Sequence, residues 1–394
     1  MKRIPASLAA VLALTATAAA DPLDTAMGKA LFARNWVAAP ASTDASDGLG
    51  PLFNARSCNA CHADGGPARF ETDKGRLKAR GLVVRSGDSD GRPHPLLGAQ
   101  LQTAALPGLA AEARIAVRLQ GEGLVVETRL QVPEDAVVLE TRIAPSLRGR
   151  GAIDRIDETA ILALADPSDR DGDGLSGRAN MIADAGGRLV PGRFGSKATG
   201  ASLMLQTATA AALDLGLSSP LVPRPHGDCT PEQADCLAHA TGRSTITEDE
   251  EISVDMVRLI TAYVATLEPR QPDMAARGFE LFRDSGCGGC HVPQLPDRDG
   301  MPVTIFSDLL LHDMGDATSS ELRDGSALPG EWRTAPLIDL DPRQETRRYL
   351  HGGKAATIEE AIRTHGGEAA PARDRFRQLD GRERQLLLDF LAQL

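Results

Sequence analysis

Three stretches of the chain alternate apolar and polar residues within residues 113–143. They read "RIAVRLQ", "LVVETRLQV" and "AVVLETRI". A period of two is typical of strands that bury one face and expose the other. The pattern therefore predicts two or three antiparallel strands in this part of the chain.

Two other stretches repeat apolar residues at helical spacing. The first is residues 252–267, where Met256, Ile260 and Tyr263 fall on one face of a helix. The second is the C-terminal sequence "GRERQLLLDFLAQL", in which we expect a helix that begins near Gly381. Both stretches are therefore predicted to be amphipathic helices.

A short motif occurs twice in the chain. The segments Gly28–Trp36 ("GKALFARNW") and Gly278–His291 ("GFELFRDSGCGGCH") share the pattern G-x-x-L-F. In the second copy the helix runs directly into a cysteine-rich sequence. In the first copy a loop rich in Ala, Ser, Asp, Gly and Pro intervenes. We interpret the two copies as an internal duplication of one structural unit.

Each copy leads to the sequence Cys-x-x-Cys-His. The residues are Cys58, Cys61 and His62 in the first copy, and Cys287, Cys290 and His291 in the second. This spacing is the attachment sequence of c-type haem, in which two thiols bond the porphyrin and the His binds iron. A zinc site would need further paired Cys or His nearby, and neither copy has them. We predict two covalently bound c-type haems.

The first twenty residues have the features of a secretory signal. Lys2 and Arg3 precede an apolar run, and Ala18–Ala20 offers a small-residue cleavage site. The run is too short and too rich in Ala and Thr for a membrane span, and no later stretch is long enough. We therefore expect a periplasmic protein with no transmembrane span.

Charge and the remaining cysteines agree with an exported protein. The net charge of −11 argues against nucleic acid and anionic membranes as partners, and it suits a basic redox partner. Cys229 and Cys236 stand outside the haem motifs and bracket "CTPEQADC". In an oxidising compartment we expect them to form a local disulfide.

Six longer stretches add a family resemblance. They are "GLGPLFNARSCNACH", "DPSDRDGDGLSGRAN", "GRFGSKA", "FSDLLLHDMG", "WRTAPL" and "YLHGGKAATIEEAIRTHGGEA". As a set they resemble the di-haem oxidoreductase family of peroxidase-like proteins, which is related to bacterial dihaem cytochrome c peroxidases and MauG-like enzymes. The expected fold is mostly α, with two cytochrome-c-like haem domains and a small antiparallel β insertion.

The expected domain boundaries follow from the motifs. Residues 1–20 would be the signal peptide. Residues 21–245 would form an N-terminal haem domain with the β insertion and an Asp-rich loop. Residues 246–394 would form a C-terminal cytochrome-c-like haem domain.

The resemblance suggests a sixth iron ligand for the C-terminal haem. Typical relatives carry Met at the end of a helix here, and the matching residue is His365. A His ligand lowers the haem potential relative to Met, so this haem is expected to carry electrons. Met314 is a rival ligand, and His365 could instead cap its helix before two glycines. His312 is expected to anchor a propionate or a loop, and His351 to lie in a turn.

The N-terminal haem has no convincing sixth ligand in the sequence, so it is the expected reaction site. Peroxide cleavage needs an open iron face and an acid–base group. Relatives use a distal Glu after this haem, and Asp154 and Glu158 are the candidate catalytic carboxylates. Either could instead be a solvated acid at the start of a helix. His94 is a candidate displaceable ligand or a loop residue, while Gln100 and Gln102 are candidates for the distal side.

One residue departs from the family pattern. "GRFGSKA" has Ser196 where relatives usually have a Trp that lies between the haems and helps to carry charge. Trp36 and Trp332 are the only tryptophans that could replace it.

An acidic loop resembles the start of an EF-hand calcium site. Asp169, Asp171 and Asp173 stand at positions 1, 3 and 5, with Gly174 at position 6. Position 12 is Asn180 rather than the usual bidentate Glu. The loop is a candidate Ca²⁺ site, and a hydrophilic turn is the alternative.

The expected function is that of a periplasmic dihaem c-type oxidoreductase of the peroxidase type. A small donor of cytochrome or cupredoxin type would supply electrons at the C-terminal haem. Hydrogen peroxide would be reduced at the N-terminal haem, or a high-valent haem would oxidise a partner protein there. The alternatives are a dihaem electron-transfer cytochrome without peroxidase activity and a thiol-oxidising accessory protein.

Overall fold

The computed structural model describes residues 21–42, 47–73, 76–88, 90–120, 123–130, 137–316, 322–341 and 346–394. The expected signal peptide therefore lies outside the described residues. The α-helices are α1 (Pro22–Ala33), α2 (Cys58–Cys61), α3 (Arg150–Arg155), α4 (Glu158–Ala163), α5 (Leu203–Ala210), α6 (Ala234–Leu237), α7 (Val254–Ala265), α8 (Arg277–Asp284), α9 (Ile358–Thr364), α10 (Ala370–Gln378) and α11 (Gly381–Leu391). None of these helices combines the length and the apolarity that a bilayer span requires.

The strands are short and numerous. They are β1 (Leu52–Phe53), β2 (Arg69–Asp73), β3 (Arg76–Arg80), β4 (Leu82–Gly87), β5 (Ala104–Ala105), β6 (Ala113–Gln120), β7 (Gly123–Leu130), β8 (Val138–Ile143), β9 (Met181–Ala183), β10 (Leu189–Pro191), β11 (Gln294–Pro296), β12 (Pro302–Thr304), β13 (Leu311–Asp313) and β14 (Glu331–Arg333). They form one four-stranded sheet in the order β2-β3-β6-β7 and several two-stranded sheets.

The prediction of a mostly α, cytochrome-c-like fold is wrong. The chain is only 30% helical, and 22% of it lies in strands of many small sheets. Most of the unpredicted strands are two or three residues long and pair across loops. Such strands are too short to show a recognisable alternation of apolar and polar residues. β2, β3 and β4 are longer and were also not predicted, although β2 and β3 alternate charged with uncharged residues.

The predicted strands and helices themselves are present. The alternating residues form β6, β7 and β8, and β6 pairs with β7 from Ala113↔Leu130 to Gln120↔Gly123. β8 leaves this sheet and pairs with β4. The helix predicted over residues 252–267 is α7, and the C-terminal helix is α11, which Asp380 and Glu383 start with a capping box.

The two G-x-x-L-F segments are helices α1 and α8, and they pack in the same way. α1 crosses α7, and a Cβ atom on Gly28 would lie 2.0 Å from the carbonyl oxygen of Leu259. α8 crosses α11, and a Cβ atom on Gly278 would lie 2.3 Å from the carbonyl oxygen of Leu386. Each glycine therefore allows two helix backbones to touch, which explains why the motif occurs twice.

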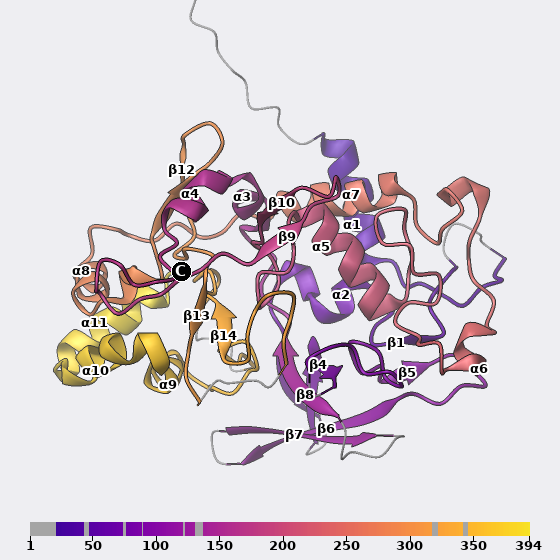
Figure 1. Ribbon diagram of the computed structural model, residues 1–394, viewed down its shortest axis with the longest axis horizontal. Helices are drawn as coiled ribbons and strands as arrows, with labels where there is room; N and C mark the ends of the chain where they lie inside the picture. The colour runs from indigo at the N-terminus through magenta and orange to yellow at the C-terminus, as the bar shows by residue number, and fades with distance from the viewer. Residues whose placement is uncertain are drawn as a thin grey trace, which may run out of the picture.

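The Leu and Phe of each motif are buried in separate hydrophobic clusters. Leu31 and Phe32 belong to one cluster with α7, and Leu281 and Phe282 to another with α9, α10 and α11. In Figure 1, α8–α11 gather at one end of the molecule, whereas β6 and β7 run along its lower edge. The domain boundary near residue 245 stays a prediction.

Candidate haem sites

The second Cys-x-x-Cys-His motif borders a large cavity. α8, which buries Phe282, is followed by a short 3₁₀ turn, Cys287–Gly289. The cavity has a volume of about 720 Å³, and its walls include Cys287, Cys290 and His291 together with mainly apolar side chains from α8–α11. Concave, mostly apolar cavities of this size are typical of cofactor sites.

Two imidazoles face each other in this cavity. The ring centroids of His291 and His365 are 6.5 Å apart. Two axial imidazoles on one iron place their centroids about 6 Å apart, given metal–nitrogen bonds of about 2 Å. His291 Nδ1 donates to the carbonyl of Phe306 at 3.0 Å, and His365 Nδ1 donates to that of Ala361 at 2.7 Å. Each ring thus keeps Nε2 for a metal.

The ionisation of this site also suits a haem. Burial lowers the pKa of His291 to about 4 and also lowers the pKa of His365, so both rings are neutral, as metal ligands must be. Burial raises the pKa of Cys287 to about 11 and also raises that of Cys290. Such thiols are protonated, which argues against a reactive dithiol.

His312 does not point at iron, because two carboxylates hold it. Its Nε2 lies 2.9 Å from Asp308 Oδ2, and its Nδ1 lies 2.7 Å from Glu368 Oε2. Burial alone would lower the pKa of His312, but hydrogen bonds with Asp308, Cys290 and Glu368 raise it to about 12. We call Asp308, His312 and Glu368 the His312 clamp. The ring is therefore an imidazolium with both nitrogens engaged.

The His312 clamp fixes the turn that follows His365. Glu368 also accepts from Asp313 N at 3.0 Å, which ties this turn to the end of β13. A Cβ atom on Gly367 would lie 2.2 Å from the carbonyl oxygen of Asp313, so only glycine allows this approach. The position of His365 thus depends on contacts with β13 as well as on α9.

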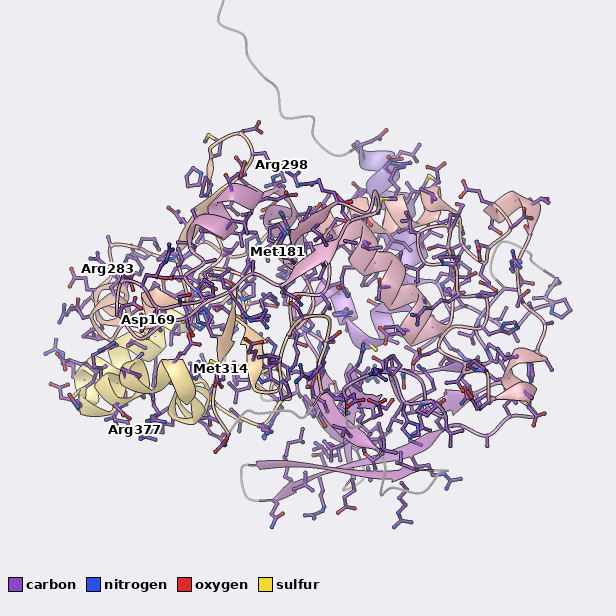
Figure 2. All side chains as sticks on the ribbon, viewed as in Figure 1. Asp169, Met181, Arg283, Arg298, Met314 and Arg377 are labelled. Carbon is purple, nitrogen blue, oxygen red and sulfur yellow. A yellow bond between two sulfur atoms is a disulfide. The ribbon has the colours of Figure 1, made fainter. Side chains whose placement is uncertain are left out.

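The acidic loop lies beside the same cavity. The carboxylates of Asp169, Asp171 and Asp173 come within 4.8 Å of one another, and Asp173 lines the cavity. Ser176, at the end of the loop, donates to Glu368 through its N at 2.8 Å and its Oγ at 2.9 Å. In Figure 2, Asp169 and Met314 are on the same side of the view as the C-terminal helices. Met314, the rival ligand, also lines the cavity.

The first motif forms α2 and a following 3₁₀ turn. Burial, and second the charge of Asp214, raise the pKa of Cys58 and of Cys61 to about 12. Burial lowers the pKa of His62 to about 4, so this ring too is neutral. His62 Nδ1 is buried and makes no hydrogen bond of ordinary geometry with a described residue. The motif has the same donor set as the second copy, but the described residues give His62 no facing imidazole like His365.

A carboxylate near this motif escaped the sequence analysis. Asp214 lies in a π-helix, Ala211–Leu215, at the end of α5, and π-turns occur frequently at functional sites. Burial raises the pKa of Asp214, while Gln100 Nε2 donates to its Oδ1 at 2.7 Å. Gln102 donates instead to the carbonyl of Leu213 at 3.0 Å. The signal available in the sequence was a lone acid in the apolar run "ATAAALDLG".

The structure gives the two predicted catalytic carboxylates other partners. Asp154 Oδ1 accepts from Leu203 N at 2.7 Å, at the start of α5. Glu158 binds Arg188 with distances of 2.7 and 3.0 Å. These contacts stabilise the α3–α5 region, and the catalytic role of Asp154 and Glu158 stays a prediction.

Of the two tryptophans, Trp332 is the one at the cavity. Its ring stacks on His351 with centroids 4.8 Å apart, and Lys197 Nζ lies 4.9 Å from the ring centroid. Arg333 N donates to the carbonyl of Ser196 at 2.9 Å, so Trp332 adjoins the residue that replaces the family Trp. The cation on its face makes it costly to place positive charge on this indole. Trp36 is buried in another cluster.

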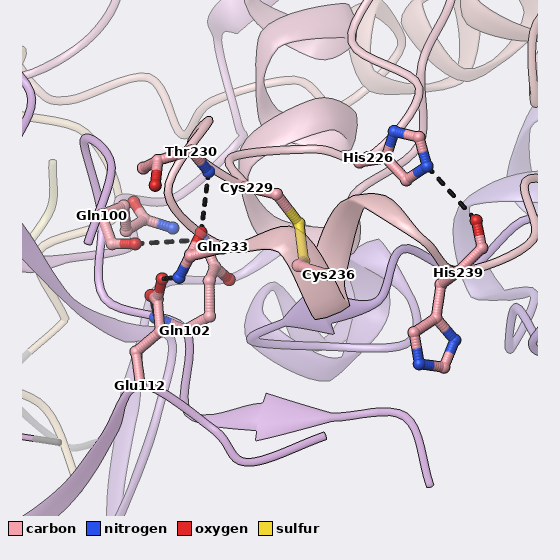
Figure 3. Close-up of a disulfide and its surroundings, with 9 residues drawn as sticks. All are labelled: Gln100, Gln102, Glu112, His226, Cys229, Thr230, Gln233, Cys236 and His239. Carbon is pink, nitrogen blue, oxygen red and sulfur yellow. Dashed lines mark hydrogen bonds between the residues drawn. A yellow bond between two sulfur atoms is a disulfide. The ribbon is translucent and has the colours of Figure 1, made fainter. Parts of the chain in front are cut away.

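The predicted disulfide is present, and Gln100 and Gln102 lie near it (Figure 3). Cys229 and Cys236 are joined, and Gln233 in this loop donates to Glu112 at 2.6 Å. His94 is buried, and its Nδ1 accepts from Leu96 N at 3.2 Å within a turn. No described contact joins His94 to His62.

Comparisons with known proteins agree with the two motifs. The sequence profile of the family described as "Di-haem oxidoreductase, putative peroxidase" matches residues 9–80 and 119–394. No curated protein matches the chain. Among solved structures, a hydrazine synthase from Kuenenia stuttgartiensis is similar, with 21% identity and a TM-score of 0.24. That likeness covers 37% of this chain and 57% of the neighbour. The family profile spans most of the sequence and includes both Cys-x-x-Cys-His motifs, so the chain belongs to the di-haem oxidoreductase family, whose cofactors are haems.

Proposed function

We propose that this protein is a periplasmic dihaem c-type oxidoreductase of the peroxidase type. One haem would be attached to Cys58 and Cys61 with His62 as ligand. The other would be attached to Cys287 and Cys290. Haem supplies the redox chemistry, and the protein sets the ligands, the access and the proton supply.

Electrons from a small donor would enter at the C-terminal site. The observation that carries this assignment is the pair His291 and His365, which face each other at 6.5 Å in the cavity with both Nδ1 atoms engaged. Two strong ligands leave no position for a substrate, which suits electron transfer.

Peroxide would react at the N-terminal site. His62 has no second imidazole opposite it among the described residues, which leaves one iron face for a substrate. A carboxylate would move the proton between the two oxygens of the peroxide. Asp154 and Glu158 remain candidates from the family pattern, and Asp214 is a third because its charge reaches both motif thiols.

Spectroscopy of the oxidised holoprotein tests the division of labour. We expect one low-spin bis-His haem and one haem that changes spin state when the protein is half-reduced, and we expect the half-reduced protein to consume peroxide. If both haems stay low-spin and no peroxide is consumed, the protein is an electron-transfer cytochrome. If a dithiol substrate is oxidised and peroxide is not consumed, the protein is a thiol-oxidising accessory protein rather than a peroxidase.

Two substitutions test the ligand. His365→Met should raise the potential of the C-terminal haem, because a thioether ligand favours reduced iron. Met314→Leu removes the rival ligand and should leave the potential unchanged. The reverse pattern would assign the iron to Met314.

Amide substitutions distinguish the carboxylates. The loss of peroxide turnover in one of Asp154→Asn, Glu158→Gln or Asp214→Asn, with unchanged haem content, identifies the acid–base group. General acid–base catalysis typically contributes about 10²–10⁴-fold, so the loss should be large. Unchanged turnover in all three variants would exclude these groups.

A further inference from the structure

The outer face of the β2-β3-β6-β7 sheet has a composition unlike the rest of the chain. The register fixes which residues share this face. Arg114 pairs with Arg129, Lys78 pairs with Glu71, and paired residues point to the same side. The opposite face carries Leu77, paired with Val117, and packs toward the apolar cluster under the sheet.

Basic residues dominate the outer face. Its basic side chains are Arg69, Lys78, Arg80, Arg114, Arg118 and Arg129. Its acidic side chains are Glu71, Asp73 and Glu127. Apart from Arg69, all of these basic side chains are exposed. The face is therefore net positive on a chain whose net charge is −11.

Two pairs on this face place like charges directly opposite each other. Arg114 faces Arg129 across β6 and β7, and Arg69 faces Arg80 across β2 and β3. Like charges at directly opposed positions destabilise a sheet. Elsewhere on the face, Lys78 pairs with Asp73 at 2.5 Å and Arg118 pairs with Glu127 at 2.7 Å. The four arginines of the like-charge pairs have no ion pair within the described residues. The arrangement thus costs stability and leaves free positive charge.

We propose that this face is the docking surface for an acidic redox protein. The inference rests on the proposed function, since it names the chemistry of a partner protein that would exchange electrons at the N-terminal haem rather than of the donor to the C-terminal haem. Opposite charge would attract the partner to this face, while the acidic remainder of the surface repels it. The charge distribution would therefore both attract the partner and orient it toward this face.

The location of the sheet supports this assignment. β2 begins at Arg69, seven positions after His62, so the sheet adjoins the N-terminal haem motif. β6 and β7 lie along an outer edge of the molecule (Figure 1). The family profile leaves residues 81–118 unmatched, and this gap contains β4, β5 and most of β6. Of the basic residues on this face, Arg114 and Arg118 lie in the gap, whereas Arg69, Lys78, Arg80 and Arg129 lie in the matched residues.

The interspersed acids favour a protein over a lipid surface. Glu71, Asp73 and Glu127 would be repelled by a uniformly anionic bilayer, but they can pair with basic groups of a protein and fix its register. The described outer face also carries no aromatic residue of the kind that anchors proteins in a membrane interface.

A binding measurement tests the proposal with the oxidised holoprotein. The probe is plastocyanin, an acidic cupredoxin, at low ionic strength and again with added salt. We expect binding that weakens as salt rises. The double variant Arg114→Gln/Arg129→Gln should weaken binding about fivefold or more. Arg283→Gln, which replaces an exposed arginine on α8 outside the sheet, should bind normally (Figure 2).

A second variant separates docking from a structural role. Arg129→Glu creates an opposite-charge pair with Arg114, so it should preserve or raise the Tm while it weakens binding. A lower Tm with unchanged binding would show that the arginines act in the fold and would overturn the proposal. Absent binding by the wild-type protein, or equal loss in Arg283→Gln, would also overturn it.

Two further measurements keep the outcomes distinct. Binding to vesicles of phosphatidylglycerol and phosphatidylcholine, with none to plastocyanin, would overturn the proposal in favour of a membrane surface. Peroxide turnover with a small artificial donor should be the same in the sheet variants and the wild type. If plastocyanin binds but no peroxide is consumed, the docking surface stands and the peroxidase function fails.

Discussion

Replacing Glu368 with Gln would test whether the His312 clamp holds His365, the proposed sixth ligand, in place. The side chain of Glu368 accepts four hydrogen bonds, from His312 Nδ1, Ser176 N, Ser176 Oγ and Asp313 N, at 2.7 to 3.0 Å. Hydrogen bonds with β13 and the acidic loop thus converge on one carboxylate three positions after His365. Gln keeps the shape of the side chain but removes its charge.

The expected cost follows from these bonds. A hydrogen bond to a charged group contributes about 1.5–3 kcal/mol, and the amide of Gln would present an N–H₂ group to the His312 N–H. Ser176 N would face the same N–H₂ group, whereas Ser176 Oγ and Asp313 N could still donate to the amide oxygen, so we expect a loss of about 2 kcal/mol. A loss of about 2 kcal/mol corresponds to roughly 30-fold in an equilibrium constant. It should lower the Tm by roughly 4 °C.

The assay compares the low-spin signal of the C-terminal haem with thermal unfolding. We expect Glu368→Gln to lower the Tm and to add a high-spin component, because the His365 turn is released from β13. Glu359→Gln is the matched control, since Glu359 forms partly exposed pairs with Arg363 at 2.7 Å and with Arg384 at 3.9 Å and should change stability by less than about 1 kcal/mol. An unchanged Tm and an unchanged spectrum in Glu368→Gln would refute the role of the His312 clamp.

Three other substitutions have defined outcomes. Gly278→Ala should destabilise the protein by at least about 2 kcal/mol in urea unfolding, because its Cβ would meet the Leu386 carbonyl, whereas Gly381→Ala, with open space around it, should not; equal effects would contradict the helix-crossing argument. Burial raises the pKa of Glu251 from 4.5 to about 7, so the folded state holds the proton of this carboxyl more tightly than the unfolded state does. The contribution of Glu251 to the free energy of unfolding is therefore greatest below pH 4.5 and is lost as the pH rises through 7. Glu251→Gln should therefore remove up to about 3 kcal/mol of this pH dependence between pH 4.5 and 8, and an unchanged profile would show that the group does not titrate there. Calcium should raise the Tm of the wild-type protein but not of Asp171→Asn, and a Tm indifferent to calcium in both would exclude the acidic loop as a site.

The haem motifs could be predicted from sequence because their chemistry is local. Two cysteines and a histidine within five residues predict haem attachment without any knowledge of the fold. His365 came from a resemblance that extended over the neighbouring turn, and the structure places it opposite His291. Glu368 and Asp308 could not be predicted, because their importance arises from a contact with His312 across loops that no periodicity connects.

The fold shows the same limit. α7 and the β6–β7 hairpin repeat apolar residues over two or more turns or strand periods, so their burial is visible in the sequence. β13 and β14 are three residues each, and they pair only because tertiary contacts align them. The helical content was overestimated because the haem motifs were associated with an all-helical cytochrome, whereas loops and small sheets enclose much of the C-terminal cavity.

The placement of the cavity wall has a consequence for biogenesis. The wall that carries His365 is built from α9, α10 and α11, which all follow Cys290 along the chain. A nascent chain that has emerged only as far as Cys290 would have both thiols but no closing wall, so the thiols would be open to the proposed haem attachment. Closure would then follow attachment, and a truncation before α9 should yield a chain that still accepts the porphyrin but leaves its iron without the second imidazole.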